Sequence, residues 1–167
     1  ALDDSNRAAS RWRVIGQQVI VSPMSLSGER FNPDAWDGYR ANRTRMLDHI
    51  TTNAIDNVVF LTGDVHSTWV FEVPATDGER SAALEFVTPA ISSPALGSNP
   101  KNVEALAGIE DRVPHLQYRN VVEQGYAIID LTPERVRVEY VYTDAASTRS
   151  ARSKGGPVFE SPSGAYA

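Results

Sequence analysis

The chain has 167 residues, 41% of them hydrophobic, which is typical of one globular domain or a large part of one. Its net charge of -5 and pI near 5.2 give no electrostatic footprint for DNA or RNA. The sequence has no apolar run of about 18 residues that could span a membrane, and no cysteine for disulfides or thiolate metal ligands. It begins at Ala1 without a methionine or a signal-peptide pattern, so we expect a processed or truncated product.

The first half of the chain is predicted to alternate between strands and one helix. Residues 12–21 are rich in β-branched side chains and form a strand that ends at Ser22-Pro23. After a polar loop, apolar residues at helical spacing predict a helix over residues 39–54, closed by Asn57. Residues 58–62 are then a short buried strand. The solvent face of the helix is expected to carry Arg40, Arg43, Arg45 and Asp48.

Strands dominate the second half. Residues 69–73 and 84–88 are predicted strands on either side of a turn at Asp77-Gly78. A loop of small residues and a short helix over residues 103–109 follow. Residues 126–132 and 136–142 are typical of a hairpin. From residue 143 the composition shifts to Ala, Ser, Gly and Pro, which predicts a weakly ordered tail over residues 143–167. This order of elements indicates a mixed α/β fold.

A carboxylate and an imidazole directly follow the buried strand over residues 58–62. Asp64 and His66 are two positions apart, so in extended backbone both side chains would point to the same side. Open α/β sheets tend to place their chemistry at this end of their strands. An oxygen ligand beside a nitrogen ligand suits the metal ions that drive phosphoester hydrolysis. From these residues alone, an exposed turn with a hydrogen-bonded histidine is an equally good interpretation.

Other polar residues have a structural interpretation beside a functional one. Residues 32–39 form either the wall of an active-site cleft or a loop that caps the next helix, with Asp37 as the cap and Trp36 packed beneath it. His49 is expected on the helix surface and His115 in a solvated loop, rather than at a metal. The turn around Ser93 favours a plain tight loop over a phosphate-binding turn.

Five sequence blocks occur in the order of a known family. They are VIGQQV (14–19), FNPDAWDGY (31–39), LTGDVHS (61–67), EFVTPAISS (85–93), and GY (125–126) leading to LTPERV (131–136). Together they resemble the C-terminal part of a PhoD-like alkaline phosphatase, within the calcineurin-like metallophosphoesterases. The resemblance covers about residues 12–142 and implies part of a β-sandwich flanked by helices, with a metal cluster at the strand ends.

The resemblance also implies roles for individual residues. In such enzymes iron and calcium ions bind the phosphoester and an activated water or oxygen ligand. His66 would bind the redox-type metal and Asp64 a neighbouring calcium ion, which makes these two residues the expected catalytic pair. Trp36 and Tyr39 would line or support the substrate cleft. Gln124 stands where many relatives carry a histidine before Gly-Tyr, so no site role carries over to it.

The family's first metal motifs lie in an N-terminal half that this chain does not contain. We therefore expect residues 1–142 to be the C-terminal portion of a metallophosphoesterase domain, inactive in isolation because two ligands cannot hold a metal cluster. The partners would be the missing half and a phosphoester substrate, and the location would be periplasmic or secreted. A phosphodiesterase rather than a monoesterase, and a metal-free α/β binding module that lost the site, are the alternatives.

Overall fold

The computed structural model describes residues 1–24, 32–76, 78, 80–144, 149 and 152–165. The strands are β1 (Arg13–Gln17), β2 (Val58–Thr62), β3 (Thr68–Pro74), β4 (Ser81–Val87), β5 (Leu116–Asn120), β6 (Gln124–Leu131), β7 (Arg135–Thr143) and β8 (Ser153–Pro162). The α-helices are α1 (Leu2–Arg7), α2 (Arg40–Thr52), α3 (Pro100–Ala105) and α4 (Ile109–Arg112), and the short 3-10 helices are η1 (Trp36–Tyr39) and η2 (Leu96–Ser98). None of the described helices has the length and apolar character needed to cross a membrane.

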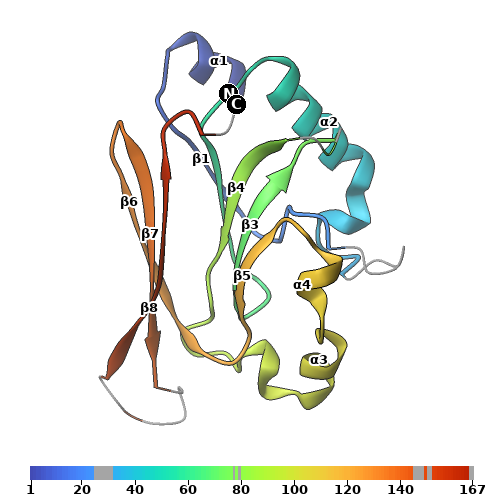
Figure 1. The fold of residues 1–167 in the computed structure, drawn as a ribbon, viewed down its shortest axis with the longest axis vertical. Coiled ribbons are helices and arrows are strands. Elements are labelled where there is room, and N and C mark those ends of the chain that lie inside the picture. Colours follow the sequence, from blue (N-terminus) through green and yellow to red (C-terminus); the bar gives the residue numbers. More distant parts are fainter. Residues whose placement is uncertain (25–31, 77, 79, 145–148, 150–151, 166–167) are drawn as a thin grey trace.

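Two sheets and a layer of helices make up the fold (Figure 1). The larger sheet has the order β1-β2-β4-β3-β5, and the smaller antiparallel sheet has the order β6-β7-β8. Strands β1, β2 and β4 are parallel, whereas β3 runs antiparallel between β4 and β5. The carboxyl ends of β1, β2 and β4 therefore lie side by side at one end of the larger sheet. The mixed α/β fold expected from the sequence is confirmed.

Strand β2 is buried on both faces, which explains its continuous apolar sequence. Val58 and Phe60 pack toward the helices, while Val59 packs toward the smaller sheet. This is the period-two alternation of extended backbone. The strand that leads to Asp64 therefore lies in the interior, between the helices and the smaller sheet.

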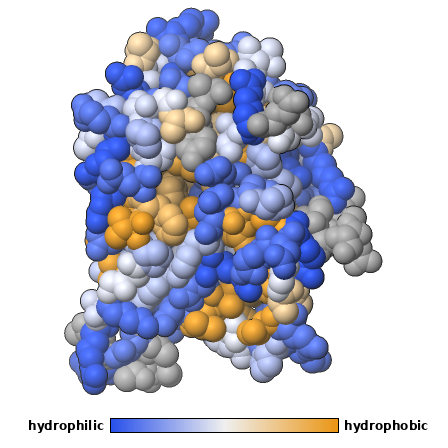
Figure 2. All heavy atoms as spheres, in the orientation of Figure 1, coloured by the Kyte–Doolittle hydropathy of each residue, from blue (hydrophilic) through white to orange (hydrophobic). Residues whose placement is uncertain are grey.

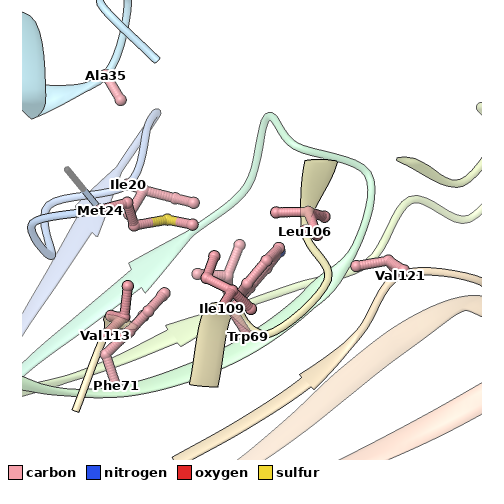
Figure 3. Close-up of a cluster of buried hydrophobic side chains, with 10 residues drawn as sticks. Ile20, Met24, Ala35, Trp69, Phe71, Leu106, Ile109, Val113 and Val121 are labelled. Atoms are coloured by element: carbon pink, nitrogen blue, oxygen red, sulfur yellow. The ribbon is translucent and has the colours of Figure 1, made fainter. Parts of the chain in front are cut away.

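Helices cover one face of the larger sheet. Leu47 and Ile50 of α2 pack in one apolar cluster with Phe60. A second cluster, shown in Figure 3, joins Leu106 and Ile109 to the stacked rings of Trp69 and Phe71. Polar residues cover most of the outer face seen in Figure 2, where apolar residues form separate groups.

The smaller sheet covers the opposite face. Val136, Val138 and Tyr140 of β7 are fully buried against residues of β2, β3 and β4. The Tyr140 hydroxyl lies 3.4 Å from the carbonyl oxygen of Trp69 and 3.3 Å from that of Val87. Burial raises the pKa of Tyr140 well above its usual value, so this hydroxyl keeps its proton and acts as a donor between the sheets.

Asn57 joins three distant parts of the chain. Its side-chain amide donates to the carbonyl of Arg11 at 2.9 Å and to the hydroxyl of Ser163 at 3.0 Å. Its side-chain oxygen accepts from the backbone N–H of Gly164 at 2.7 Å. The expectation that Asn57 closes the preceding helix is wrong, because α2 ends at Thr52.

A buried carboxylate connects β4 to the end of β2 and to the segment that follows β1. Glu85 of β4 is fully buried and accepts from the backbone N–H groups of Val21 and Ser22, each at 2.8 Å. It also accepts from the hydroxyl of Thr62, the last residue of β2, at 2.8 Å. Burial raises the pKa of Glu85 above its usual value, and these hydrogen bonds oppose that rise.

A second buried acid holds the same segment further along. Asp37 accepts from the N–H of Met24 at 3.0 Å and from the guanidinium of Arg43 at 2.7 Å. Arg43 is buried and also donates to the carbonyl of Val21. Two expectations are therefore wrong: Asp37 does not cap α2, and Arg43 does not face solvent, because each neutralises the other in the interior.

His115 holds the segment from the other side. It is partly buried, with Nε2 2.8 Å from the carbonyl oxygen of Pro23 and its ring against Phe71. The expectation of a solvated loop side chain is wrong for this residue. Burial lowers the pKa of His115 below its usual value, which favours the neutral imidazole. The segment from Val21 to Met24 is thus bound by side chains from β4, η1, α2 and the turn before β5.

Several predicted elements are confirmed, and others differ. The predicted hairpin is present as β6 and β7, with the N–H of Thr132 donating to the carbonyl of Arg135 across the turn. The expected helix over residues 103–109 is instead two short helices, α3 and α4. Helix α1 and strand β5 were not predicted from the sequence. The weakly ordered tail is wrong for Ser153–Pro162, which forms β8 because it pairs along β7. The loop through residues 25–31 and the Asp77 side of the predicted turn lie outside the described residues.

We predict that Glu85→Gln destabilises the chain by about 1–3 kcal/mol at pH 4, because an amide nitrogen cannot accept from a backbone N–H, whereas both oxygens of the protonated acid can. The pKa of Glu85 is raised on folding. The contribution of this group to the free energy of unfolding is therefore fully present below pH 4.5 and is lost as the pH rises through the folded-state pKa. The stability difference between the two chains should therefore narrow between pH 4 and pH 8. Urea unfolding at each pH measures it, and a difference that widens would contradict the assignment.

Candidate functional site

The loop of residues 63–67 between β2 and β3 carries the candidate pair. Asp64 and His66 are both exposed. Their φ angles are +74° and +50°, so the backbone is left-handed rather than extended, and the premise that extended geometry aligns the two side chains is wrong. Of the five non-glycine residues with positive φ in the described chain, two are therefore in this loop. Such strain costs about 1–3 kcal/mol per residue and clusters at functional sites.

Packing of the intervening residue holds this loop in place. Val65 packs against the cluster that contains Trp69 and Phe71. Its carbonyl accepts from the hydroxyl of Ser67 at 2.9 Å, and that hydroxyl accepts from Nε1 of Trp69 at 2.7 Å. The anchored Val65 leaves the side chains on either side of it on the surface.

The imidazole of His66 is held in one orientation. Its Nδ1 lies 3.2 Å from the carbonyl oxygen of Pro94, which can only accept, so Nδ1 carries the hydrogen. The lone pair of a neutral ring is then on Nε2. The carbonyl of His66 also accepts from the N–H of Leu96 at 3.2 Å. A histidine whose second nitrogen donates to a backbone carbonyl is the usual arrangement of a metal ligand.

The loop that carries Pro94 begins where β4 ends, beside the end of β2. The N–H and the hydroxyl of Thr88 both donate to the carbonyl of Thr62, at 2.9 and 3.1 Å. The sequence blocks stop at Ser93, just before the acceptor of His66. Sequence reasoning missed Pro94 because a backbone acceptor leaves no mark in the residue type.

The two predicted cleft residues lie on the helical side of the molecule. Trp36 packs with Leu2 and Met46 against the cluster under α2, and Tyr39 is 58% exposed. From the same segment, it is Ala35 that packs in the cluster against which Val65 rests. The structure therefore brings the 32–39 segment beside the Asp64–His66 loop but turns Trp36 toward α2, and the cleft role of Trp36 and Tyr39 stays a prediction.

The described residues do not form a complete metal site on their own. Asp64 offers carboxylate oxygens and His66 offers Nε2, and both fit a metal ion in their chemistry. Within the described ranges, however, there is no group of three or more His, Cys, Asp or Glu side chains that could hold a metal. A tetrahedral site needs about four ligands. His49 does not contribute, because it lies on α2 and pairs with Asp3 at 2.7 Å.

Known proteins resemble this chain in sequence and in fold. The family model for PhoD-like phosphatases matches residues 2–140. Alkaline phosphatase D of Bacillus subtilis (strain 168) is 29% identical over 139 residues, which are 80% of this chain and 23% of that protein. The chain thus spans about a quarter of the length of this curated relative.

A solved structure described as the structure of PhoD has the same fold. The likeness has a TM-score of 0.78 at 24% identity, and it covers 97% of this chain and 32% of the other. The resemblance predicted from the sequence blocks is confirmed. Because the family model matches most of its residues, the chain belongs to the PhoD-like phosphatase family.

Proposed function

We propose that this chain is the C-terminal part of a metal-dependent phosphoester hydrolase of the alkaline phosphatase type. The observation that carries the proposal is the exposed pair of Asp64 and His66 beyond the end of β2, with Nε2 of His66 left free by the hydrogen bond to Pro94. Family membership supports the reaction class, and the name of the Bacillus relative supports phosphatase activity.

Asp64 and His66 would hold ions of the calcium and iron type, as the family resemblance implies. When bound, such ions neutralise phosphoester oxygens and lower the pKa of a coordinated water. The chain's own contribution is geometric. The bond to Pro94 orients the His66 ring, and Glu85 fixes Thr62 two residues before Asp64. These contacts hold both donors in place before substrate arrives.

The remaining ligands would come from polypeptide outside these residues, as the greater length of the relative suggests. Strands β1 and β6 support this proposal, because each pairs with a single neighbour in the described sheets. They lie on the same side of the molecule, since Nε1 of Trp12 donates to the carbonyl of Thr132 at 2.6 Å. On these strands Val14, Tyr126 and Ile128 are 43%, 40% and 49% exposed. Open edges with apolar side chains are suited to pairing with further strands.

We predict that the isolated 167-residue chain does not hydrolyse p-nitrophenyl phosphate, even with added calcium and iron, because its described part lacks a complete ligand set. Release of p-nitrophenol measures this. The matched control is the double variant Asp64→Asn/His66→Gln, which identifies turnover from a contaminating phosphatase. Turnover in the wild type that disappears in the double variant would contradict the need for a second part.

In a longer polypeptide that carries these residues, we predict that Asp64→Ala and His66→Gln lower bound metal and kcat together. The loss should exceed the roughly 10–100-fold effect of removing an outer partner of a ligand. Mass spectrometry of the metals and phosphatase kinetics measure the two quantities. Asp48→Ala and His49→Gln on the surface of α2 are matched controls and should change neither.

The outcome of these variants also separates the alternatives. Full metal content in both site variants would show that Asp64 and His66 are not metal ligands. A wild-type protein that binds no metal would favour the binding module that kept the fold. If metal and activity are present, kcat/KM on a phosphomonoester and a phosphodiester decides between the two esterase classes.

A further inference from the structure

The loop of residues 88–97 lies between the His66 ring and the segment of residues 121–125. On one side it accepts from Nδ1 of His66 and donates to the His66 carbonyl. On the other side it is held at its two ends and near its centre. These three contacts are Ala90 O with Gly125 N at 3.0 Å, Gly97 N with Val121 O at 2.6 Å, and Ser93 O with Gln124 Nε2 at 2.6 Å.

The central contact is the one made by a side chain. Gln124 is 8% exposed and is the first residue of β6. Close packing fixes its backbone, because a Cβ on the neighbouring Gly125 would lie 2.1 Å from the carbonyl oxygen of Val141. The two end contacts are made between backbone atoms and survive most substitutions. The position of the loop centre therefore depends on the Gln124 amide.

The loop centre is directly connected to the His66 acceptor. Gln124 binds the carbonyl of Ser93, and His66 binds the carbonyl of the next residue, Pro94. Proline fixes its own φ near −65° and restricts the residue before it to extended conformations. Fixing the Ser93 carbonyl therefore limits the directions in which the Pro94 carbonyl can point.

We infer that Gln124 is a positioning residue for His66. It holds the peptide of Ser93 and Pro94 so that the Pro94 carbonyl selects the Nδ1–H tautomer and leaves Nε2 free for a metal ion. This inference deepens the proposed function and rests on it for the role of Nε2. The tautomer of His66 can be measured without metal, substrate or a second part of the polypeptide.

The test is the ¹⁵N chemical shifts of the imidazole nitrogens in the 167-residue chain, at a pH where imidazole is neutral. Wild type should show His66 with hydrogen on Nδ1. Gln124→Met keeps the side-chain volume but removes the donor, and we expect the ratio of Nδ1–H to Nε2–H at His66 to fall about fivefold. That factor corresponds to weakening a hydrogen bond by about 1 kcal/mol.

The chain contains its own reference. His115 donates from Nε2 to the Pro23 carbonyl, so it should show the opposite tautomer in the same spectrum and stay unchanged in Gln124→Met. Gln117→Met, at an exposed glutamine on β5, is the matched control and should leave both rings unchanged. His66→Gln assigns the His66 signals by their disappearance.

A folded Gln124→Met chain with an unchanged His66 ratio would overturn the inference, and so would a wild-type His66 with hydrogen on Nε2. If Gln124→Met does not fold, Gln124→Asn decides the question. Its side chain is one methylene shorter, which moves the amide away from the Ser93 carbonyl, so the ratio should fall by the same factor. Failure of metal binding in the longer polypeptide with a normal tautomer response would instead count against the proposed function alone.

Discussion

The buried carboxylate of Glu85 is the interaction on which the candidate site depends. Parallel strands β1, β2 and β4 end at the same edge, and the chain leaving β1 would bury two backbone N–H groups there without partners. An unpaired buried N–H costs about 1–3 kcal/mol. Glu85 accepts from both groups and from Thr62, so one side chain satisfies the segment after β1 and fixes the end of β2.

Other buried polar residues extend this arrangement. Asp37, Arg43 and His115 each bind backbone atoms between Val21 and Met24. Val65 then packs against the cluster that includes Met24, so the support reaches the loop between Asp64 and His66. This rigid support can keep the two exposed residues, Asp64 and His66, in left-handed backbone conformations that would relax in a free loop.

Features with a local cause could be predicted from the sequence, and features made by distant contacts could not. The hairpin follows from alternation and a turn, and Asp64 and His66 follow from an apolar strand with a polar end. The contacts that support the site join residues far apart in the sequence: His66 and Pro94 are 28 positions apart, and Val21 and Glu85 are 64 apart. Their roles depend on how the strands pair, which residue type alone does not specify.

Misassigned elements have the same origin. Arg43 is charged and was expected in solvent, but it is buried because Asp37 lies six residues earlier. β8 is rich in Gly, Ser and Pro and has weak intrinsic strand preference, yet it forms because β7 offers a complete edge. In both places tertiary context overrides local propensity.

The side chain of Asn57 has a consequence for how the chain folds during synthesis. Its contacts with Ser163 and Gly164 join residues 106 and 107 positions apart. Contacts of such separation carry a large loop-closure cost and form slowly. The start of β2 therefore leaves the ribosome long before the residues that complete its hydrogen bonds, and its final structure must wait until Ser163 and Gly164, which follow β8, are translated.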